Sequence, residues 1–259
     1  MTIDSSPRWT RLGLGLVAVF AVFQWSAVAL GSDRGQAGLI VGALVVASTL
    51  AVERFAFGRA LAPAARSLGL GRPRAAGMVM AAVVGVLLVL VVPVFVGVTG
   101  VSWTLTPRWP LLLPGLFAQG GIAEEILFRG YLYGHLRAGR SFWCAAWLAT
   151  LPFVVVHLLL FVTMPWPIAL AALLLSLVLS FPLARLFDLG GFTIWPPAII
   201  HFVVQGTVKI VEVSGPGSPA FPLVWIAASA VIPMLVFVLG RRPTNDAFER
   251  RVPRDNNYR

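Results

Sequence analysis

Charged residues are scarce in this sequence. Asp, Glu, Lys and Arg together make up 12% of its 259 residues, whereas 58% are hydrophobic and the mean hydropathy is +0.88. A soluble protein of this size could not bury so much apolar surface. The apolar runs are about 20 residues long and continuous, and lipid accepts only helices or closed barrels as spanning structures. We therefore predict an all-α, polytopic transmembrane helical bundle.

Cysteine and lysine are almost absent as well. Cys144 is the only cysteine, which excludes an intrachain disulfide and a cysteine metal cluster. Lys209 is the only lysine, and the predominance of Arg indicates a GC-rich bacterial genome. A net charge of +10 would suggest nucleic-acid binding in a soluble protein. Here most arginines flank apolar runs and orient them in the bilayer, so we expect no nucleic-acid partner.

Eight apolar runs are long enough to span a membrane. They cover residues 12–31, 37–57, 77–99, 110–135, 142–163, 166–187, 192–212 and 221–240. We predict a single transmembrane domain over residues 1–240, and a basic, disordered cytoplasmic tail over 241–259. Ala27-Val28-Ala29 resembles a signal-peptide cleavage site, but the length of the first run favours a retained helix.

The distribution of basic residues predicts the topology. With eight spans, seventeen basic residues lie on the side of both termini, and only Arg34, Arg108 and Lys209 lie on the other. The positive-inside rule then places both termini in the cytoplasm, in a multi-pass protein of the plasma membrane. The arginine-rich loop from Gly58 to Arg74 is expected at the lipid headgroups, with a short amphipathic helix.

Few strongly polar residues remain inside the runs, and three of them have matching depth. Each intramembrane ionisable residue is a functional hypothesis, because insertion at the bilayer centre costs at least ~2.5–3.5 kcal/mol. Counted from the cytoplasmic ends at ~1.5 Å per residue, Glu124, His157 and His201 all lie roughly 14–23 Å deep. We therefore expect these side chains to share one site.

Helical spacing predicts which of the neighbouring polar side chains pair with one another. Glu125 and Arg129 are four residues apart and are expected to form an ion pair. Glu124 lies about 100° further around the helix. It should point away from that pair without a partner on its own helix, as a general base would. His201 and Gln205 share one face of the seventh run.

Two further polar features are expected to be structural. Lys209 and Glu212 are three residues apart near the outer end, which predicts a solvated ion pair. His135 lies at a helix end, where it is expected to anchor the helix at the membrane interface.

Three motifs now resemble a known family. Glu124-Glu125-x-x-x-Arg129, Phe153-x-x-x-His157 and His201-x-x-x-Gln205 are similar to the motifs of the CAAX protease and bacteriocin-processing family of intramembrane endopeptidases. The resemblance covers about residues 110–210, within a motif-bearing core of about 110–212. It implies that Glu124 and His201 activate a water and that His157 and Gln205 stabilise the oxyanion. Glu125, Arg129 and Phe153 would support the site.

The resemblance also implies a substrate and leaves two questions open. The substrate would be a membrane-embedded or lipidated protein, cleaved in a cytoplasm-facing cavity. Glu124, His157 and His201 could hold a divalent metal such as zinc with an open water position, or could run a metal-free, glutamate-based hydrolysis. The family usually has Asn or Asp where this chain has Gln205. This departure motivates an alternative, a catalytically reduced or inactive member that acts as a membrane scaffold or accessory subunit.

A proton-coupled transporter is a third interpretation, because buried Glu and His also build proton relays. We find no internal repeat relating the two halves of the chain, and such repeats are common in transporters.

Overall fold

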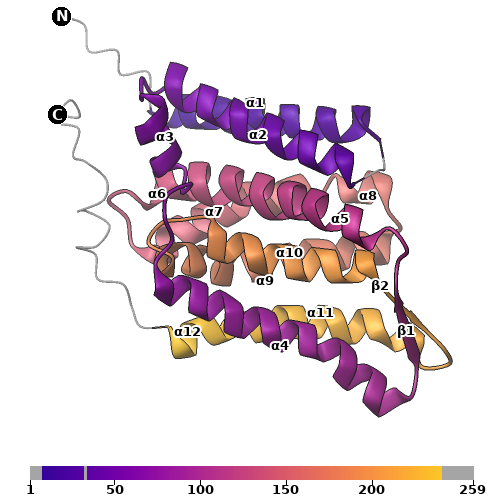
Figure 1. Ribbon diagram of the computed structural model, residues 1–259. Helices are drawn as coiled ribbons and strands as arrows, with labels where there is room; N and C mark the ends of the chain where they lie inside the picture. Colours follow the sequence, from indigo (N-terminus) through magenta and orange to yellow (C-terminus); the bar gives the residue numbers. More distant parts are fainter. Residues whose placement is uncertain (1–7, 32–33, 241–259) are drawn as a thin grey trace, which may run out of the picture.

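The protein is an elongated bundle of helices that run side by side along one axis (Figure 1). The structure is a computed structural model, and it describes residues 8–31 and 34–240. Within these ranges, seven helical segments are long and apolar enough to cross a membrane. They are Trp9–Ala29, Gln36–Phe55, Ala75–Thr99, Trp109–Arg137, Phe142–Thr163, Trp166–Leu189 and Ser218–Leu239. The predicted all-α transmembrane bundle is confirmed.

The helices follow one another in the order predicted from the apolar runs. The helical elements are α1 (Arg8–Ala29), α2 (Gln36–Phe55), α3 (Leu61–Ser67), α4 (Ala75–Thr99), α5 (Trp109–Leu116), α6 (Gly134–Arg137), α7 (Phe142–His157), α8 (Leu160–Thr163), α9 (Trp166–Leu189), α10 (Trp195–Ile210), α11 (Phe221–Val231) and α12 (Leu235–Leu239). Short 3-10 turns, Ser218–Ala220 and Ile232–Met234, precede α11 and α12. Between α5 and α6 the chain stays helical but widens into π-helical turns, Phe117–Ala123 and Ile126–Tyr133.

The seventh apolar run differs from its predicted form. Helix α10 has 16 residues and ends at Ile210, short of the ~20 residues of a full span. It packs inside the bundle against α4, α9 and the first π-helical segment. The chain then continues as strand β2 (Val211–Ser214), which pairs antiparallel with β1 (Ser102–Leu105). These strands, which we did not predict, close the end of the bundle opposite the termini (Figure 1).

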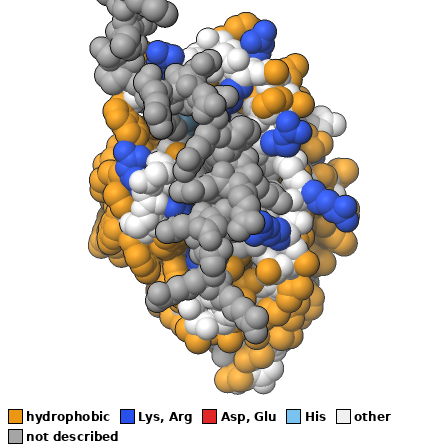
Figure 2. All heavy atoms as spheres, turned by 90° about the vertical axis from the view of Figure 1, so that its left-hand side faces the viewer, with side chains coloured by type: hydrophobic (Ala, Val, Ile, Leu, Met, Phe, Trp, Pro, Cys, Tyr) orange, Lys and Arg blue, Asp and Glu red, His pale blue; other side chains and the backbone are white. Residues whose placement is uncertain are grey.

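Basic side chains gather on one end of the bundle. Figure 2 shows this face with Arg side chains across it and hydrophobic side chains around its rim. Arg54, Arg66, Arg72 and Arg74 are exposed in this region. The described chain also begins and ends here (Figure 1). The arrangement matches the arginine-rich side predicted from the sequence, whose cytoplasmic orientation stays a prediction. The predicted tail over 241–259 lies outside the described residues.

Two apolar clusters hold the bundle together. One is built around the helix of the first motif, where Leu127 and Tyr131 pack with Val19 of α1 and Val45 of α2. The other joins α4, α9, α10 and α11 through residues that include Val84, Leu88, Leu183, Ile200 and Trp225. The polar residues of α10 therefore lie between two packed units, which fixes the depth and direction of their side chains.

Candidate active site

The two adjacent carboxylates lie between two widened stretches of their helix. Glu124 and Glu125 stand between the π-helical turns Phe117–Ala123 and Ile126–Tyr133. Such turns interrupt regular helical hydrogen bonding and occur frequently at functional sites. This geometry changes one expectation. Glu124 does not point away from the Glu125 pair, because both carboxylates reach the same imidazole, that of His201.

Glu125 is completely buried and holds two partners. Its Oε1 accepts from Arg129 Nη1 at 2.9 Å, so the predicted ion pair is present. The same oxygen lies 2.6 Å from His201 Nδ1. The Arg129 guanidinium also lies 4.5 Å from the centre of the Phe153 ring. A buried charge of this kind is tolerated only with such partners, because an uncompensated one costs several kcal/mol.

His201 is oriented by the carboxylate behind it. An ionised carboxylate can only accept hydrogen bonds. His201 Nδ1 therefore donates to Glu125, and Nε2 is left as the acceptor nitrogen of the ring. That nitrogen faces the amide nitrogen of Gln205 at 2.7 Å and Glu124 Oε2 at 3.5 Å.

Gln205 connects the carboxylate of Glu124 with the imidazole of His201. Its Nε2 donates to Glu124 Oε1 at 3.2 Å and to His201 Nε2. Its Oε1 lies 3.5 Å from Lys209 Nζ. The Glu124 side chain remains 14% exposed, whereas those of Glu125 and His201 are 0% and 5% exposed. Glu124 is therefore more accessible than Glu125 and His201.

His157 is not hydrogen-bonded to this cluster, and the Phe153 ring lies near both imidazoles. Its Nδ1 donates to the Phe153 carbonyl at 2.7 Å, and its ring packs edge-on against the Phe153 ring at 4.7 Å. The Phe153 ring in turn lies 6.4 Å from that of His201. Within residues 8–31 and 34–240, no hydrogen bond or ion pair joins His157 to Glu124 or His201. The site thus unites Glu124, His201 and Gln205 directly and His157 through an aromatic ring.

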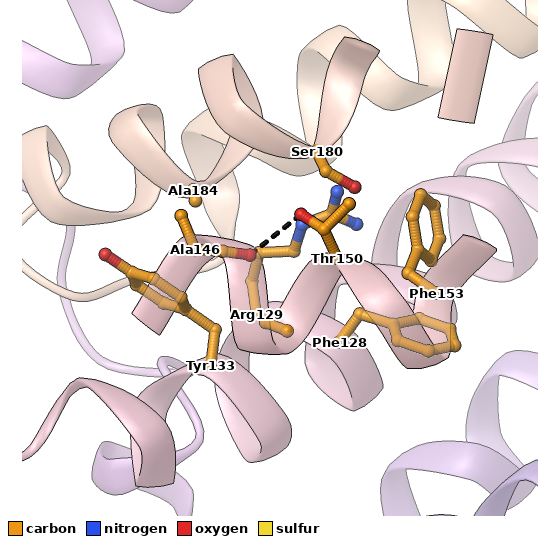
Figure 3. A pocket seen from close by; sticks show the side chains of 9 residues that line it. Phe128, Arg129, Tyr133, Ala146, Thr150, Phe153, Ser180 and Ala184 are labelled. Atoms are coloured by element: carbon orange, nitrogen blue, oxygen red, sulfur yellow. Dashed lines mark hydrogen bonds between the residues drawn. The ribbon is translucent and has the colours of Figure 1, made fainter. Parts of the chain in front are cut away.

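A small cavity lies beside the support of the site. Figure 3 shows Phe128, Arg129 and Phe153 on its wall, with Thr150 and Ser180 from the neighbouring helices. The two hydroxyls donate to backbone carbonyls one turn earlier in their own helices. Glu124 and His201 do not line this cavity. It is therefore not a cavity around Glu124 and His201.

Two structural expectations need correction. Lys209 points toward Gln205, whereas Glu212 lies exposed on β2 opposite Thr104, because the helix ends before it. In the part of the chain that the structure describes, no ion pair joins Lys209 and Glu212. His135 is buried, and its Nε2 lies 2.7 Å from Glu53 Oε1. It therefore belongs to the protein interior and not to the interface.

Sequence reasoning missed two buried carboxylates. Glu53 of α2 is paired with Arg59 at 2.7 Å as well as with His135. Asp188 of α9 accepts from Tyr133 at 3.0 Å and pairs with Arg137 at 3.3 Å. Both acids lie near the ends of apolar runs, where charge is ordinarily solvated. The sequence signal that could have identified them is an acidic residue on the side of the membrane that otherwise carries mostly arginines.

The predicted metal ligands are not gathered around a common point. In the described ranges, no group of three or more His, Cys, Asp or Glu side chains is placed to hold a metal ion. The nitrogens of His201 face Glu125 and Gln205, and His157 Nδ1 is bonded to the Phe153 carbonyl. The present arrangement of these side chains therefore does not fit a zinc site of the predicted composition.

Comparison with known proteins confirms the family resemblance. Residues 104–207 match the model of a family described as type II CAAX prenyl endopeptidase Rce1-like. The match contains all three motifs and spans the helix of the two carboxylates through α10. No curated protein and no solved structure gives a significant match to the chain.

Proposed function

Since residues 104–207 carry an Rce1-like domain of the CAAX protease type, we propose that the chain is an intramembrane endopeptidase. Its substrate is a membrane-anchored or lipidated protein, and the bond cleaved is a peptide bond. One observation carries the proposal. A continuous chain of polar contacts runs from Glu124 through Gln205 and His201 to Glu125 and Arg129, at the middle of two apolar helices.

Glu124 is the general base of this proposal. It is the most exposed acid of the cluster, and no Arg or Lys is paired with it among the described residues. In the reaction it accepts a proton from a water as the water oxygen forms its bond to the scissile carbonyl carbon. It then gives this proton to the amine that leaves when the C–N bond breaks. A positioned carboxylate of this kind contributes ~10²–10⁴-fold.

His201 assists Glu124 because its basic nitrogen faces the same point. The hydrogen bond from Nδ1 to Glu125 holds the ring in one tautomer. Nε2 accepts a hydrogen bond from the attacking water once the Gln205 N–H group has turned from it to the substrate oxygen. Arg129 holds the Glu125 carboxylate in position through their ion pair. Glu125 and Arg129 are thus positioning residues behind the imidazole.

Gln205 supplies the donor for the oxyanion. Both N–H groups of its amide donate in this structure, one to Glu124 and one to His201. In the reaction the N–H group that faces His201 turns to the oxygen of the entering carbonyl. Loss of one such donor costs ~2.7–4 kcal/mol in the transition state. His157 donates its Nδ1 hydrogen to Phe153, so it can offer a second donor only through Nε2 of its protonated form.

The test compares membrane proteins from cells that carry wild-type protein or Glu124→Gln. We expect a substrate to accumulate uncut with the variant, and purified wild-type protein to cleave that substrate at least ~100 times faster than the variant. Glu212→Gln is the matched control, because this carboxylate is exposed on β2, outside the site. Equal cleavage by Glu124→Gln and wild type would end the proposal.

A membrane scaffold is the second candidate. The observation that favours it is the position of the Gln205 amide nitrogen, which satisfies Glu124 and His201 without a water between them. A scaffold would keep its cellular function in Glu124→Ala and His201→Ala, with partner capture intact. Loss of function in both variants, with normal protein levels, argues against it.

A further inference from the structure

The two ends of the Gln205 side-chain amide face groups of opposite hydrogen-bonding character. Its nitrogen end faces a carboxylate and the basic nitrogen of an imidazole, and both of these accept hydrogen bonds. Its oxygen end faces the ammonium group of Lys209 at 3.5 Å. An ammonium group has three donors and no acceptor. Each end of the amide is therefore matched to its neighbours.

Reversing this amide would mismatch both ends. The carbonyl oxygen would then face the Glu124 carboxylate, and the NH₂ group would face the Lys209 ammonium. An amide in the wrong orientation presents no donor where the reaction needs one. Lys209 lies four residues after Gln205 on α10, so both side chains project from one face of the helix. The only lysine of the chain is thus the group that faces the oxygen end of the amide.

Gly120 provides the space that the oxygen end occupies. A Cβ atom at this position would lie 2.7 Å from Gln205 Oε1 and 3.4 Å from its Cδ. Gly120 lies on the π-helical segment that faces α10. Any side chain here would push the amide away from Lys209 or rotate it. Since the contact is with the end of a flexible side chain, the displacement would change the site more than the fold.

We propose that Lys209 and Gly120 are positioning residues that together form a socket for Gln205. Gly120 leaves room for the long side chain, and Lys209 holds its oxygen so that its N–H group is presented to Glu124 and His201. Through the role of Gln205 this inference rests on the proposed peptidase function. Lys209 and Gly120 themselves touch neither water nor substrate in the reaction.

The first test is kinetic and uses protein in nanodiscs with a quenched fluorescent peptide that carries a farnesylated cysteine before its last three residues. Lys209→Met keeps the length of the side chain and removes the ammonium. We expect kcat to fall on the order of tenfold with KM unchanged, since small misplacements of catalytic groups have effects up to about 100-fold. Lys209→Arg restores a cationic donor and should recover most of the rate. Glu212→Gln should match wild type.

The second test adds a methyl group to the socket and then shortens the side chain that the methyl group would contact. Gly120→Ala should reduce kcat by up to about 100-fold. The same substitution should cost much less in a Gln205→Asn background, because the shorter side chain withdraws from the added methyl group. Gly85→Ala on α4 is the control, since a Cβ there would meet only Ile200 Cδ1 at 3.7 Å. Equal losses for Gly120→Ala in both backgrounds would overturn the socket.

A third measurement separates the socket from the proposed function. A thermal unfolding cycle with Lys209→Met and Gln205→Leu needs no substrate. If Lys209 acts on Gln205, its substitution shifts the unfolding midpoint in wild type but not in the Gln205→Leu background. This result supports the socket even if no variant, wild type included, cleaves the peptide. Additive shifts overturn the socket even if wild type is an active peptidase.

Discussion

The buried pair of Glu125 and Arg129 allows the energetic cost of one substitution to be worked out. Arg129→Met keeps much of the side-chain volume and removes the charge. Glu125 is fully buried, so it would lose the cation that lies 2.9 Å away. Removing one partner of a buried ion pair costs about 3–5 kcal/mol. The contact of the guanidinium with the Phe153 ring is lost as well, which adds about 2 kcal/mol for a desolvated pair.

The double variant gives the sharper expectation. Glu125→Leu combined with Arg129→Met removes both charges, and apolar replacements of buried pairs are often neutral. His201 would still lose the acceptor for its Nδ1 hydrogen, and an unsatisfied buried donor costs about 1–3 kcal/mol. We therefore expect the double variant to be more stable than Arg129→Met alone, although less stable than wild type.

The measurement is the free energy of unfolding in detergent micelles, followed by tryptophan fluorescence. Arg66→Met is the control, since Arg66 is exposed on the basic face and its replacement should change stability by less than about 0.5 kcal/mol. The reasoning fails if Arg129→Met lies within about 1 kcal/mol of wild type. It also fails if the double variant is no more stable than the single one.

Two further predictions test the packing around the site and the strand pair. Gly130→Ala should lower the free energy of unfolding by about 1–3 kcal/mol, because the new methyl group would overlap the Leu68 carbonyl oxygen. Gly134→Ala is the control, since its methyl group would meet its neighbours at ordinary contact distance. Unfolding measurements on both variants test this prediction. Ser102→Cys with Ser214→Cys in a cysteine-free background should form a disulfide on mild oxidation, since these residues are directly paired and their hydroxyl oxygens lie 2.9 Å apart. Free thiols by mass spectrometry after oxidation would contradict the pairing of β1 with β2.

The sequence was sufficient for the bundle and for the central motif residues because both depend on local information. Apolar length identifies the helices, and a spacing of four residues brings Glu125 to Arg129 and His201 to Gln205 on their own helices. The family match over residues 104–207 agrees with that reading.

What the sequence could not predict depends on contacts between distant segments. His135 reaches Glu53 across 82 positions, and Arg137 reaches Asp188 across 51. A charge near the end of an apolar run has the same local pattern whether it is solvated or buried. The convergence of Glu124 and Glu125 on His201 was missed for a related reason, since it requires the crossing of α10 and a widened helix.

The buried carboxylates differ in their partners, and this difference separates structure from chemistry. Glu53, Glu125 and Asp188 are each at most 2% exposed, and each is paired with an arginine. Glu124 keeps 14% of its side chain exposed and contacts only neutral groups or an imidazole among the described residues. An acid that is paired in this way serves stability, whereas an accessible acid without a cation can exchange a proton with water.

This division predicts opposite outcomes for four matched substitutions. Glu53→Gln, Glu125→Gln and Asp188→Asn each leave a buried arginine or histidine without its anion, so each should lower the free energy of unfolding by about 3–5 kcal/mol. Glu124→Gln leaves no cation unpaired, so it should change stability by less than about 1 kcal/mol while it removes cleavage. Unfolding and cleavage measured on the same four preparations test the division. If Glu124→Gln lowered the free energy of unfolding as much as the other three substitutions do, Glu124 would belong with the structural pairs. The assignment of Glu124 as the general base would then be wrong.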